Sequence, residues 1–325
     1  MMEKMSNPQS MGPNKISVVI PTYNRAEFIL ETLESVFCQT VTDTEIVVVD
    51  DGSTDNTCEI LEPLIRKGRI IYVKQNNKGE AAARNEGIRR SSGKYIAFLD
   101  SDDLFLPDKL ELQADYLDKN SEDVLVHSWY SKFDSKGNDL GVRNTSVFNG
   151  DIYPDILNIW KVLIAVPCVM VRAEIFNEIG YFDEDFRWAA DLDMWRRITR
   201  KYSIGVINKV LSKVRVHPGN ISADKKDSEL AFEKYLNKAR HEDPELDEKF
   251  IKNMTSLMYV NVAKTIFSTA SRTEMVHVRE SCRKALGQKK VNWEAYILWY
   301  ASFLPLGIRD RLLVIWRKMN YPGSI

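Results

Sequence analysis

The chain has 325 residues, of which 44% are hydrophobic and 28% are charged, and this composition excludes wholesale disorder. The formal net charge of −1 excludes a general attraction to nucleic acid. The charge is unevenly divided, because residues 225–325 carry 18 Lys/Arg and 12 Asp/Glu, whereas the rest of the chain carries 27 and 34. An acidic first part suits a metal site, and a basic last part suits contact with an anionic partner.

The cysteines and the first residues bear on location. The four cysteines are widely separated and form no cluster with histidines, so the sequence does not predict a zinc site. Scattered, unpaired cysteines are typical of a reduced intracellular protein, and we expect a cytoplasmic one. Residues 1–15 are polar and lack the apolar core of a signal peptide, so they are expected to be a disordered leader.

Short runs rich in Val and Ile alternate with amphipathic stretches from residue 16 onward. The runs predict strands at 16–20, 45–49, 70–73, 95–99 and 124–126, and the stretches predict helices near 26–38, 55–66, 80–91 and 107–119. Such alternation favours an α/β fold with a doubly wound, mostly parallel central sheet.

The alternation of predicted strands and helices changes twice further along the chain. Residues 134–138 read Asp-Ser-Lys-Gly-Asn, which predicts a tight turn between two strands. A second helix–strand section runs to about residue 220, and helical patterns dominate beyond residue 223. We therefore expect a catalytic domain at 16–222 and an α-helical C-terminal region at 223–325.

Polar clusters follow the predicted strands at the point where each strand ends. They are Pro21-Thr22-Tyr23-Asn24-Arg25, Asp50-Asp51-Gly52-Ser53, Asn76-Asn77-Lys78-Gly79 with Arg84, and Asp100-Ser101-Asp102-Asp103. In open α/β sheets, ligands bind beyond the carboxyl ends of the strands. Four clusters at four successive strand ends therefore predict one site.

The aspartates at 100, 102 and 103 are the strongest local signal. Carboxylates this close repel one another unless a cation neutralises them. Oxygen ligands suit Mg²⁺ or Mn²⁺, which often bridge to phosphate groups of a substrate. The alternative is that Asp103 caps the following helix, although a single aspartate would suffice for that role.

Two other clusters predict nucleotide contacts. Asp51 at a strand end can accept hydrogen bonds from a nucleobase or ribose, whereas the alternative is a turn in which Ser53 caps the next helix. Arg84 follows the start of a predicted helix, where a phosphate would be favoured, although it could also be an exposed helical arginine. The glycine patterns of dinucleotide-binding and phosphate-binding loops are absent from the sequence.

The motifs taken together, and in this order, resemble those of the family 2 glycosyltransferases. They are Ile20-Pro-Thr-Tyr-Asn24, Val49-Asp-Asp-Gly-Ser-Thr-Asp55, Gly79-Glu-Ala-Ala-Ala-Arg-Asn85 and Leu99-Asp-Ser-Asp-Asp103. The resemblance covers about residues 16–222. It implies a GT-A-type fold and an inverting transfer of sugar from a nucleotide-diphosphate sugar, expected to be a UDP-sugar, with Mn²⁺ or Mg²⁺ as cofactor.

The resemblance also implies a role for each motif residue. Those expected to line the uridine pocket are Pro21, Tyr23 and Asp51, and those expected to bind substrate beside them are Thr22, Asn24 and Gly79. Arg84 should lie near the uracil or the diphosphate. Asp102 should face the ribose and the metal, and Asp103 should hold the metal.

The segment Trp188-Ala-Ala-Asp-Leu-Asp-Met-Trp195 resembles the part of the family that bears the catalytic base. The family's usual acidic pair is broken here by Ala190. By register Asp191 matches the base, and Asp193 is the second candidate. A base is needed to take the proton of the acceptor hydroxyl. The alternative is that Asp191 only caps a helix.

Residues 214–222 resemble a loop that closes over the diphosphate in relatives. Arg215 is therefore expected to touch phosphate, and His217 is expected to touch phosphate or the metal. A lone histidine is as often structural, so both interpretations of His217 remain open.

The expected partners are a UDP-sugar and a glycan or lipid-linked acceptor, in the assembly of cell-surface polysaccharide or oligosaccharide. One alternative is a nucleotide-sugar pyrophosphorylase, which would need a glycine-rich basic loop after the first strand. The other is a non-catalytic sugar-nucleotide-binding or scaffold protein on the same fold. The sugar, acceptor and linkage do not follow from the fold.

The tail at 293–319 is apolar and aromatic, with basic residues after it. Its uncharged stretch at 295–308 has 14 residues, whereas a membrane-spanning helix needs about 20. Apolar residues beside Arg309, Arg311, Arg317 and Lys318 are typical of a helix in the membrane interface. They predict peripheral attachment at the inner face of the cytoplasmic membrane. The alternative is packing on the catalytic domain or on a second subunit of a homo-oligomer.

Overall fold

The structure is a computed structural model that describes residues 16–144, 146–217, 225–269 and 275–304. The chain divides into two compact units, residues 1–220 and 221–325. The predicted leader at 1–15, the end of the 214–222 loop and residues 305–319 of the tail lie outside the described residues.

The first half of unit 1 alternates strands and helices as predicted. Its elements are β1 (Ile16–Thr22), α1 (Ile29–Phe37), β2 (Thr44–Asp50), α2 (Thr57–Arg66), β3 (Ile71–Lys74), α3 (Glu80–Arg90) and β4 (Tyr95–Phe98). The four strands pair in parallel in the order β3-β2-β1-β4. The apolar runs form these strands because both faces of the parallel sheet are covered.

The second half of unit 1 extends the same sheet with strands of mixed direction. Its elements are β5 (Leu104–Phe105), α4 (Lys109–Lys119), β6 (Asp123–Asp134), β7 (Asp139–Asn144), two 3₁₀ turns (Asp155–Leu157 and Val166–Cys168), β8 (Val169–Arg172), α5 (Ile175–Ile179), α6 (Ala190–Thr199) and β9 (Ser203–Val216). The sheet order is β3-β2-β1-β4-β8-β6-β9-β5, with β7 on β6. The turn predicted at 134–138 is confirmed, because it joins β6 to β7.

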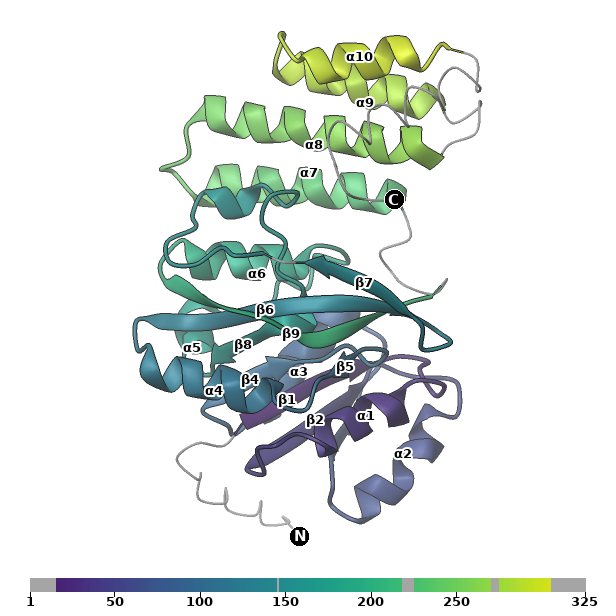
Figure 1. Cartoon of the computed structure of the whole chain (residues 1–325), viewed down its shortest axis with the longest axis vertical. Coiled ribbons are helices and arrows are strands. Elements are labelled where there is room, and N and C mark those ends of the chain that lie inside the picture. Colours follow the sequence, from purple (N-terminus) through teal and green to yellow (C-terminus); the bar gives the residue numbers. More distant parts are fainter. Residues whose placement is uncertain (1–15, 145, 218–224, 270–274, 305–325) are drawn as a thin grey trace. The chain divides into compact units, whose positions relative to one another are not determined.

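Helices cover both faces of the sheet, as the doubly wound prediction requires (Figure 1). Residues of α1, α2 and α4 share one buried cluster with the sheet, and Ala83 of α3 packs with Val47 and Val49 on the other face. The helix α3 approaches β1 closely because residue 87 is glycine: a Cβ there would lie 2.3 Å from Val19 Cγ1. This contact fixes α3, and the residues at its start, against the carboxyl edge of the sheet.

The described part of unit 2 contains four helices. They are α7 (Lys225–Glu242), α8 (Glu248–Thr269), α9 (Met275–Gln288) and α10 (Trp293–Ala301). The helices α8 and α9 pack against each other, and α10 packs on both of them. Tyr235, Met258, Val278 and Cys282 are buried in this bundle. Among the described helices, none is both long and apolar enough to cross a bilayer.

Candidate functional site

The candidate site lies where the parallel strands end. The strands β2 and β3 lie on one side of β1, and β4 lies on the other side, so the chain changes direction across the sheet between β1 and β4. Ligands of open α/β sheets bind at the carboxyl edge beside such a switch point. All four polar clusters predicted from the sequence follow strands that end at this edge.

The loop after β1 is tied to the loop after β2 by Asn24. Asn24 has a φ of +53°, which favours asparagine over most residues. Its main-chain N–H donates to Ser53 Oγ at 2.9 Å, and its Oδ1 accepts the Thr54 N–H at 2.8 Å. Ser53 therefore serves this junction and does not cap α2, which begins only at Thr57.

Beside this junction, the three residues before Asn24 differ in exposure. Pro21 and Thr22 are buried, and the Thr22 hydroxyl has no hydrogen-bond partner. Tyr23 is 42% exposed and is therefore available to stack on a planar group.

Asp51 organises the loop that leads into α3. Its carboxylate accepts hydrogen bonds from the main-chain N–H groups of Lys78 (2.9 Å) and Gly79 (2.8 Å) and from Gln75 Nε2 (2.7 Å). Gly79 has a φ of +94° immediately before α3, a conformation that favours glycine. The predicted pocket residues Asp51 and Gly79 are thus brought together, and Asp51 is buried.

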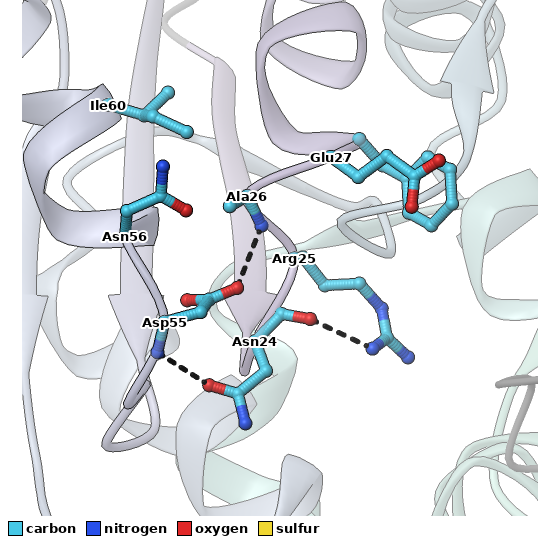
Figure 2. A pocket seen from close by; sticks show the side chains of 8 residues that line it. Asn24, Arg25, Ala26, Glu27, Asp55, Asn56 and Ile60 are labelled. Carbon is cyan, nitrogen blue, oxygen red and sulfur yellow. Dashed lines mark hydrogen bonds between the residues drawn. The ribbon is translucent and has the colours of Figure 1, made fainter.

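A pocket of ≈ 420 Å³ adjoins the junction of the two loops (Figure 2). Figure 2 shows Asn24 between Arg25 and Asp55, with Asp55 accepting the Ala26 N–H at 3.2 Å. Arg25 lines this pocket and also reaches the acidic turn, because its Nε lies 3.2 Å from Asp102 Oδ2. The sequence motifs predict no separate role for Arg25.

Arg84 is the centre of a charged cluster at the start of α3. It is buried, and its guanidinium donates to Asp100 Oδ1 at 2.8 Å and to the carboxylate of Glu80. Burial would lower the pKa of Arg84, but the carboxylates of Glu80, Asp100 and Asp191 outweigh it and keep the group charged. Burial, opposed by Arg84, raises the pKa of Glu80 to about 7. The sequence motif contains Glu80, but its pairing with Arg84 was not predicted.

The turn after β4 brings its aspartates to different partners. Asp102 Oδ2 lies 3.0 Å from His217 Nε2, and Asp103 Oδ1 accepts the Arg215 N–H at 2.8 Å. Burial, followed by the charges of Asp100 and Asp102, raises the pKa of Asp103 well above its ordinary value. Asp103 does not cap α4, whose N-cap is Asp108.

Within the described parts of the chain, no three acidic, histidine or cysteine side chains already converge as a metal site. The donor set still fits a hard divalent ion, because Asp102 and His217 are adjacent and Asp103 lies in surplus negative charge. The metal assignment of Asp103, Asp102 and His217 stays a prediction.

Arg215 holds the end of β9 against the acidic turn. Its Nε donates to the Asp102 carbonyl at 2.8 Å, and its guanidinium also pairs with Glu31 Oε2 at 2.5 Å. The guanidinium carbon lies 4.8 Å from the Phe28 ring centroid and 4.3 Å from that of Phe133. In this structure the Arg215 side chain is therefore engaged by the protein, and its predicted phosphate contact remains a prediction.

The two aspartates in the first turn of α6 differ in burial and in their ion pairs. Asp193 is fully buried and pairs with Arg196 (2.9 Å) and Arg197 (2.9 Å), so its charge is compensated inside the helix. Asp191 is only half-buried, and it does not cap α6, whose N-cap position is Ala189 with a φ of +67°. Burial raises the pKa of Asp191, and Arg84 opposes this rise.

Asn85 connects the segment before α6 to α3. Its Nδ2 donates to the Phe182 carbonyl, and its Oδ1 accepts the Phe182 N–H, both at 2.9 Å. Phe98, Phe182 and Trp195 pack edge to face or tilted beneath this contact. The contact brings Asp191 within the electrostatic reach of Arg84 and Asp100. Asn85 lies in a recognised motif, but only the fold shows what it binds.

Comparison with protein families identifies a matching family model. Residues 17–180 match the model of glycosyl transferase family 2. An uncharacterized glycosyltransferase of Rickettsia felis is 42% identical over 211 residues, which are 65% of this chain and 34% of that protein. The chondroitin synthase of Escherichia coli is 34% identical over 216 residues, which are 65% of this chain and 30% of that protein. The match thus spans about a third of the length of these relatives.

Solved structures share the fold at low sequence identity. A TarS 1-349 structure from S. aureus in complex with UDP-GlcNAc has a TM-score of 0.59 and 20% identity, covering 89% of this chain and 90% of that one. A mannosyltransferase from Pyrobaculum calidifontis in complex with GDP-Man and Mn²⁺ has a TM-score of 0.59 and 18% identity, covering 98% and 92%. The GT-A-type fold expected from the sequence is confirmed by these likenesses.

Proposed function

The chain belongs to glycosyltransferase family 2, and from that premise we propose that it transfers a sugar from a UDP-sugar to a hydroxyl acceptor with inversion at the anomeric carbon. We assign the reaction to residues 16–222. The observation that supports the proposal is the convergence of four polar clusters at one edge of the sheet, with Asp191 close enough to Arg84 for the arginine's charge to act on its pKa. Asp191 keeps a raised pKa there, which suits a group that must accept a proton.

The donor would bind along the loops that follow β1, β2 and β3. Tyr23 is exposed and can stack on the base, and Pro21, Thr22, Asn24, Asp51 and Gly79 shape the loops around it. Arg84 would contact the uracil or the diphosphate, where its fixed charge favours an anion. Asp102 would lie towards the ribose and Arg215 towards the phosphates.

In the chemical step, Asp191 would take the proton of the acceptor hydroxyl. The acceptor oxygen then forms a bond to the anomeric carbon while the bond from that carbon to the diphosphate oxygen breaks on the opposite face. Attack from one face with departure from the other inverts the configuration. Asp193 does not serve as the base, because its carboxylate is sealed between two arginines.

A divalent ion, Mn²⁺ or Mg²⁺, would be held by Asp103, Asp102 and His217 and would offset the negative charge that develops on the departing diphosphate. Asp103 contributes by lying in a buried cluster of carboxylates whose repulsion a cation relieves.

A UDP-sugar is preferred as donor because the motif residues resemble a uridine pocket, and the TarS structure with UDP-GlcNAc shares the fold. The structure with GDP-Man shares it equally, so GDP-sugars belong in the test. The likeness to chondroitin synthase supports a glycan acceptor in surface polysaccharide or oligosaccharide assembly, and a lipid-linked glycan is the second acceptor class to test.

The test is a panel of UDP- and GDP-sugars assayed for nucleotide release with Mn²⁺, Mg²⁺ or chelator, beside calorimetric titration with UDP. We expect one UDP-sugar to be turned over in a metal-dependent way. The Asp191→Asn variant should bind UDP like the wild type, with turnover lowered by roughly a hundredfold or more. UDP binding by the wild type with no turnover of any donor would instead favour a non-catalytic sugar-nucleotide-binding protein.

A further inference from the structure

The helix α10 presents a row of large apolar and aromatic side chains to solvent. Trp293, Ile297 and Tyr300 are 73%, 64% and 65% exposed, and Phe303 just beyond the helix is 59% exposed. Residues three or four apart lie on one face of a helix. Together with Tyr296, these four residues form a continuous surface that we call the aromatic ridge.

The opposite side of α10 attaches it to the bundle through small residues. Ala295 and Ser302 are buried. Asn292 caps the helix by accepting the Ala295 N–H at 3.2 Å, and its Nδ2 donates to Ser256 Oγ at 2.9 Å. The small side chains thus face the protein and the large ones face out. This is the reverse of a helix that stabilises a core with its large apolar side chains.

The aromatic ridge is held in place by ring contacts. The Trp293 and Tyr296 ring centroids are 6.2 Å apart, and the half-buried Trp299 lies 5.0 Å from both Tyr300 and Phe303. The Arg279 guanidinium lies 4.8 Å from the Phe303 ring centroid. A surface ordered in advance loses little side-chain entropy when it binds.

The surroundings of the ridge are basic. Residues 275–304 contain five Lys/Arg and two Asp/Glu. Of these bases, Lys284 is paired with Glu229 at 2.7 Å and Glu233 at 3.1 Å in α7 and does not add to the excess. Of the two acids, Glu294 is paired with Lys264 at 2.9 Å. Lys289 and Lys290 are exposed just before α10. The sequence after residue 304 adds four Lys/Arg and one Asp, so the basic character continues.

From this combination we propose that the aromatic ridge seats the C-terminal unit on an anionic lipid surface. Tryptophan and tyrosine carry an apolar body and a polar tip, which suits the headgroup level of a bilayer. Neighbouring lysines are attracted to anionic headgroups. A second copy of the chain suits the ridge less well, because a two-fold contact would bring the same basic surroundings of both copies together.

The test is flotation of the full chain with phosphatidylcholine vesicles, with and without phosphatidylglycerol, at low and high salt. We expect binding to the anionic vesicles at low salt. The triple variant Trp293→Ser, Ile297→Ser, Tyr300→Ser should lose roughly tenfold or more in partitioning, because the apolar insertion is removed. Neutralising Lys289 and Lys290 with glutamine should cost about fivefold each on anionic vesicles only.

The matched control carries Leu230→Ser and Val147→Ser, which remove side chains that are 64% and 62% exposed elsewhere. It should float like the wild type. Brominated lipid should quench tryptophan fluorescence in the wild type and less in Trp293→Ser. Nucleotide release from the donor in solution should be equal in all variants. Flotation therefore tests lipid binding and nucleotide release tests the proposed transfer, and either proposal can fail without the other.

Three outcomes would overturn the proposal. The first is recovery of the wild type in the lipid-free fraction with anionic vesicles at low salt. The second is flotation of the triple variant equal to that of the control. The third is a wild-type dimer in sedimentation that the triple variant dissociates, without flotation of either, in which case the occupant of the ridge is a second copy of the chain.

Discussion

The turn after β4 and the first turn of α6 both carry closely spaced aspartates, and the two regions compensate their charges differently. In the turn after β4, Asp102 and Asp103 draw partners from distant elements, including Arg25 and the main chain of Arg215. In α6, Asp193 is neutralised by arginines of its own helix. Asp191 shares Arg84 with other carboxylates and keeps a raised pKa.

The difference distinguishes a carboxylate whose charge is compensated within its own helix from the one that we propose to be the catalytic base. A buried carboxylate between two arginines stabilises its surroundings but cannot accept a proton without losing both pairs. A carboxylate with a shared cation retains basicity. Substitutions in the two regions should therefore differ in whether they change activity or stability.

The largest effect is expected in the acidic turn. Asp103→Ala should abolish transfer and remove most of the metal dependence of UDP binding, because a buried oxygen ligand is lost. Nucleotide release and calorimetric UDP titration with and without Mn²⁺ would measure both effects. Thermal stability should fall only modestly, since the lost hydrogen bond from the buried Arg215 N–H is offset by removal of a carboxylate in surplus negative charge. Wild-type activity in the variant, or full activity of the native protein in chelator, would contradict the metal assignment.

Asp191→Asn should lower kcat by roughly a hundredfold or more, which is typical for the loss of a general base. Affinity for UDP should stay nearly unchanged, because the amide keeps the size of the side chain. Single-turnover assays beside UDP titration would measure both quantities. The assignment of the base to Asp191 is contradicted if Asp193→Asn shows this loss of kcat and Asp191→Asn does not.

Asp193→Asn should act on stability, since it removes the negative charge that pairs with the buried Arg196. Breaking one partner of a buried pair costs about 3–5 kcal/mol of unfolding free energy. Denaturant unfolding would measure this cost, with Asp191→Asn as the matched control of the same chemistry in the same helix turn. The activity of the fraction that remains folded should stay close to wild type. An unchanged unfolding free energy would show that the Asp193–Arg196 pair does not stabilise α6.

The smallest effect is expected from Glu80→Gln and is a shift in pH dependence. The proton acceptor must be ionised, so kcat should fall as pH drops through the raised pKa of Asp191, above the usual aspartate range. Glu80, with a pKa of about 7, carries its charge only in the upper part of this pH range, where it competes with Asp191 for Arg84. Removing that charge leaves Arg84 freer to stabilise ionised Asp191 at those pH values, so the acid limb should move slightly to lower pH.

The shift should be below about one pH unit, because Arg84 is only partly released. A kcat profile across the acid range would measure it, with Glu86→Gln in the same helix as the control. An acid limb that stays in place or moves to higher pH would show that Glu80 does not act on Asp191 through Arg84.

Several elements could be predicted from local pattern alone. The strands near residues 16, 45, 70 and 95 follow from continuous apolar runs, and the helices between them follow from their periodicity. The polar strand ends could be placed at one edge because parallel strands share their direction. The strand β9 and its pairing with β6 and β5 were not predicted, because long-range pairing leaves no local signal.

The candidate residues could be identified from the sequence, but the residues that they contact could not. Asp191 and Asp193 have the same residue type in the same turn, and only the packing of Arg196 and Arg197 distinguishes them. Asn85 was visible in a motif without a role, because its partner Phe182 is brought close only by the fold. Glu80 lies four residues before its partner Arg84, but only the fold adds Asp100 to this pair.

The sequence by itself determined the α/β order, the family motifs and the residue types of the candidate site, because periodicity and short spacings are properties of neighbouring residues. Only the tertiary structure decided which charges are compensated and which face of α10 is buried. The residues of α10 are apolar on nearly every side, so periodicity could not assign an inner face. Small Ala295 and Ser302 face the bundle because they allow close helix packing, and the aromatic side chains are left outside.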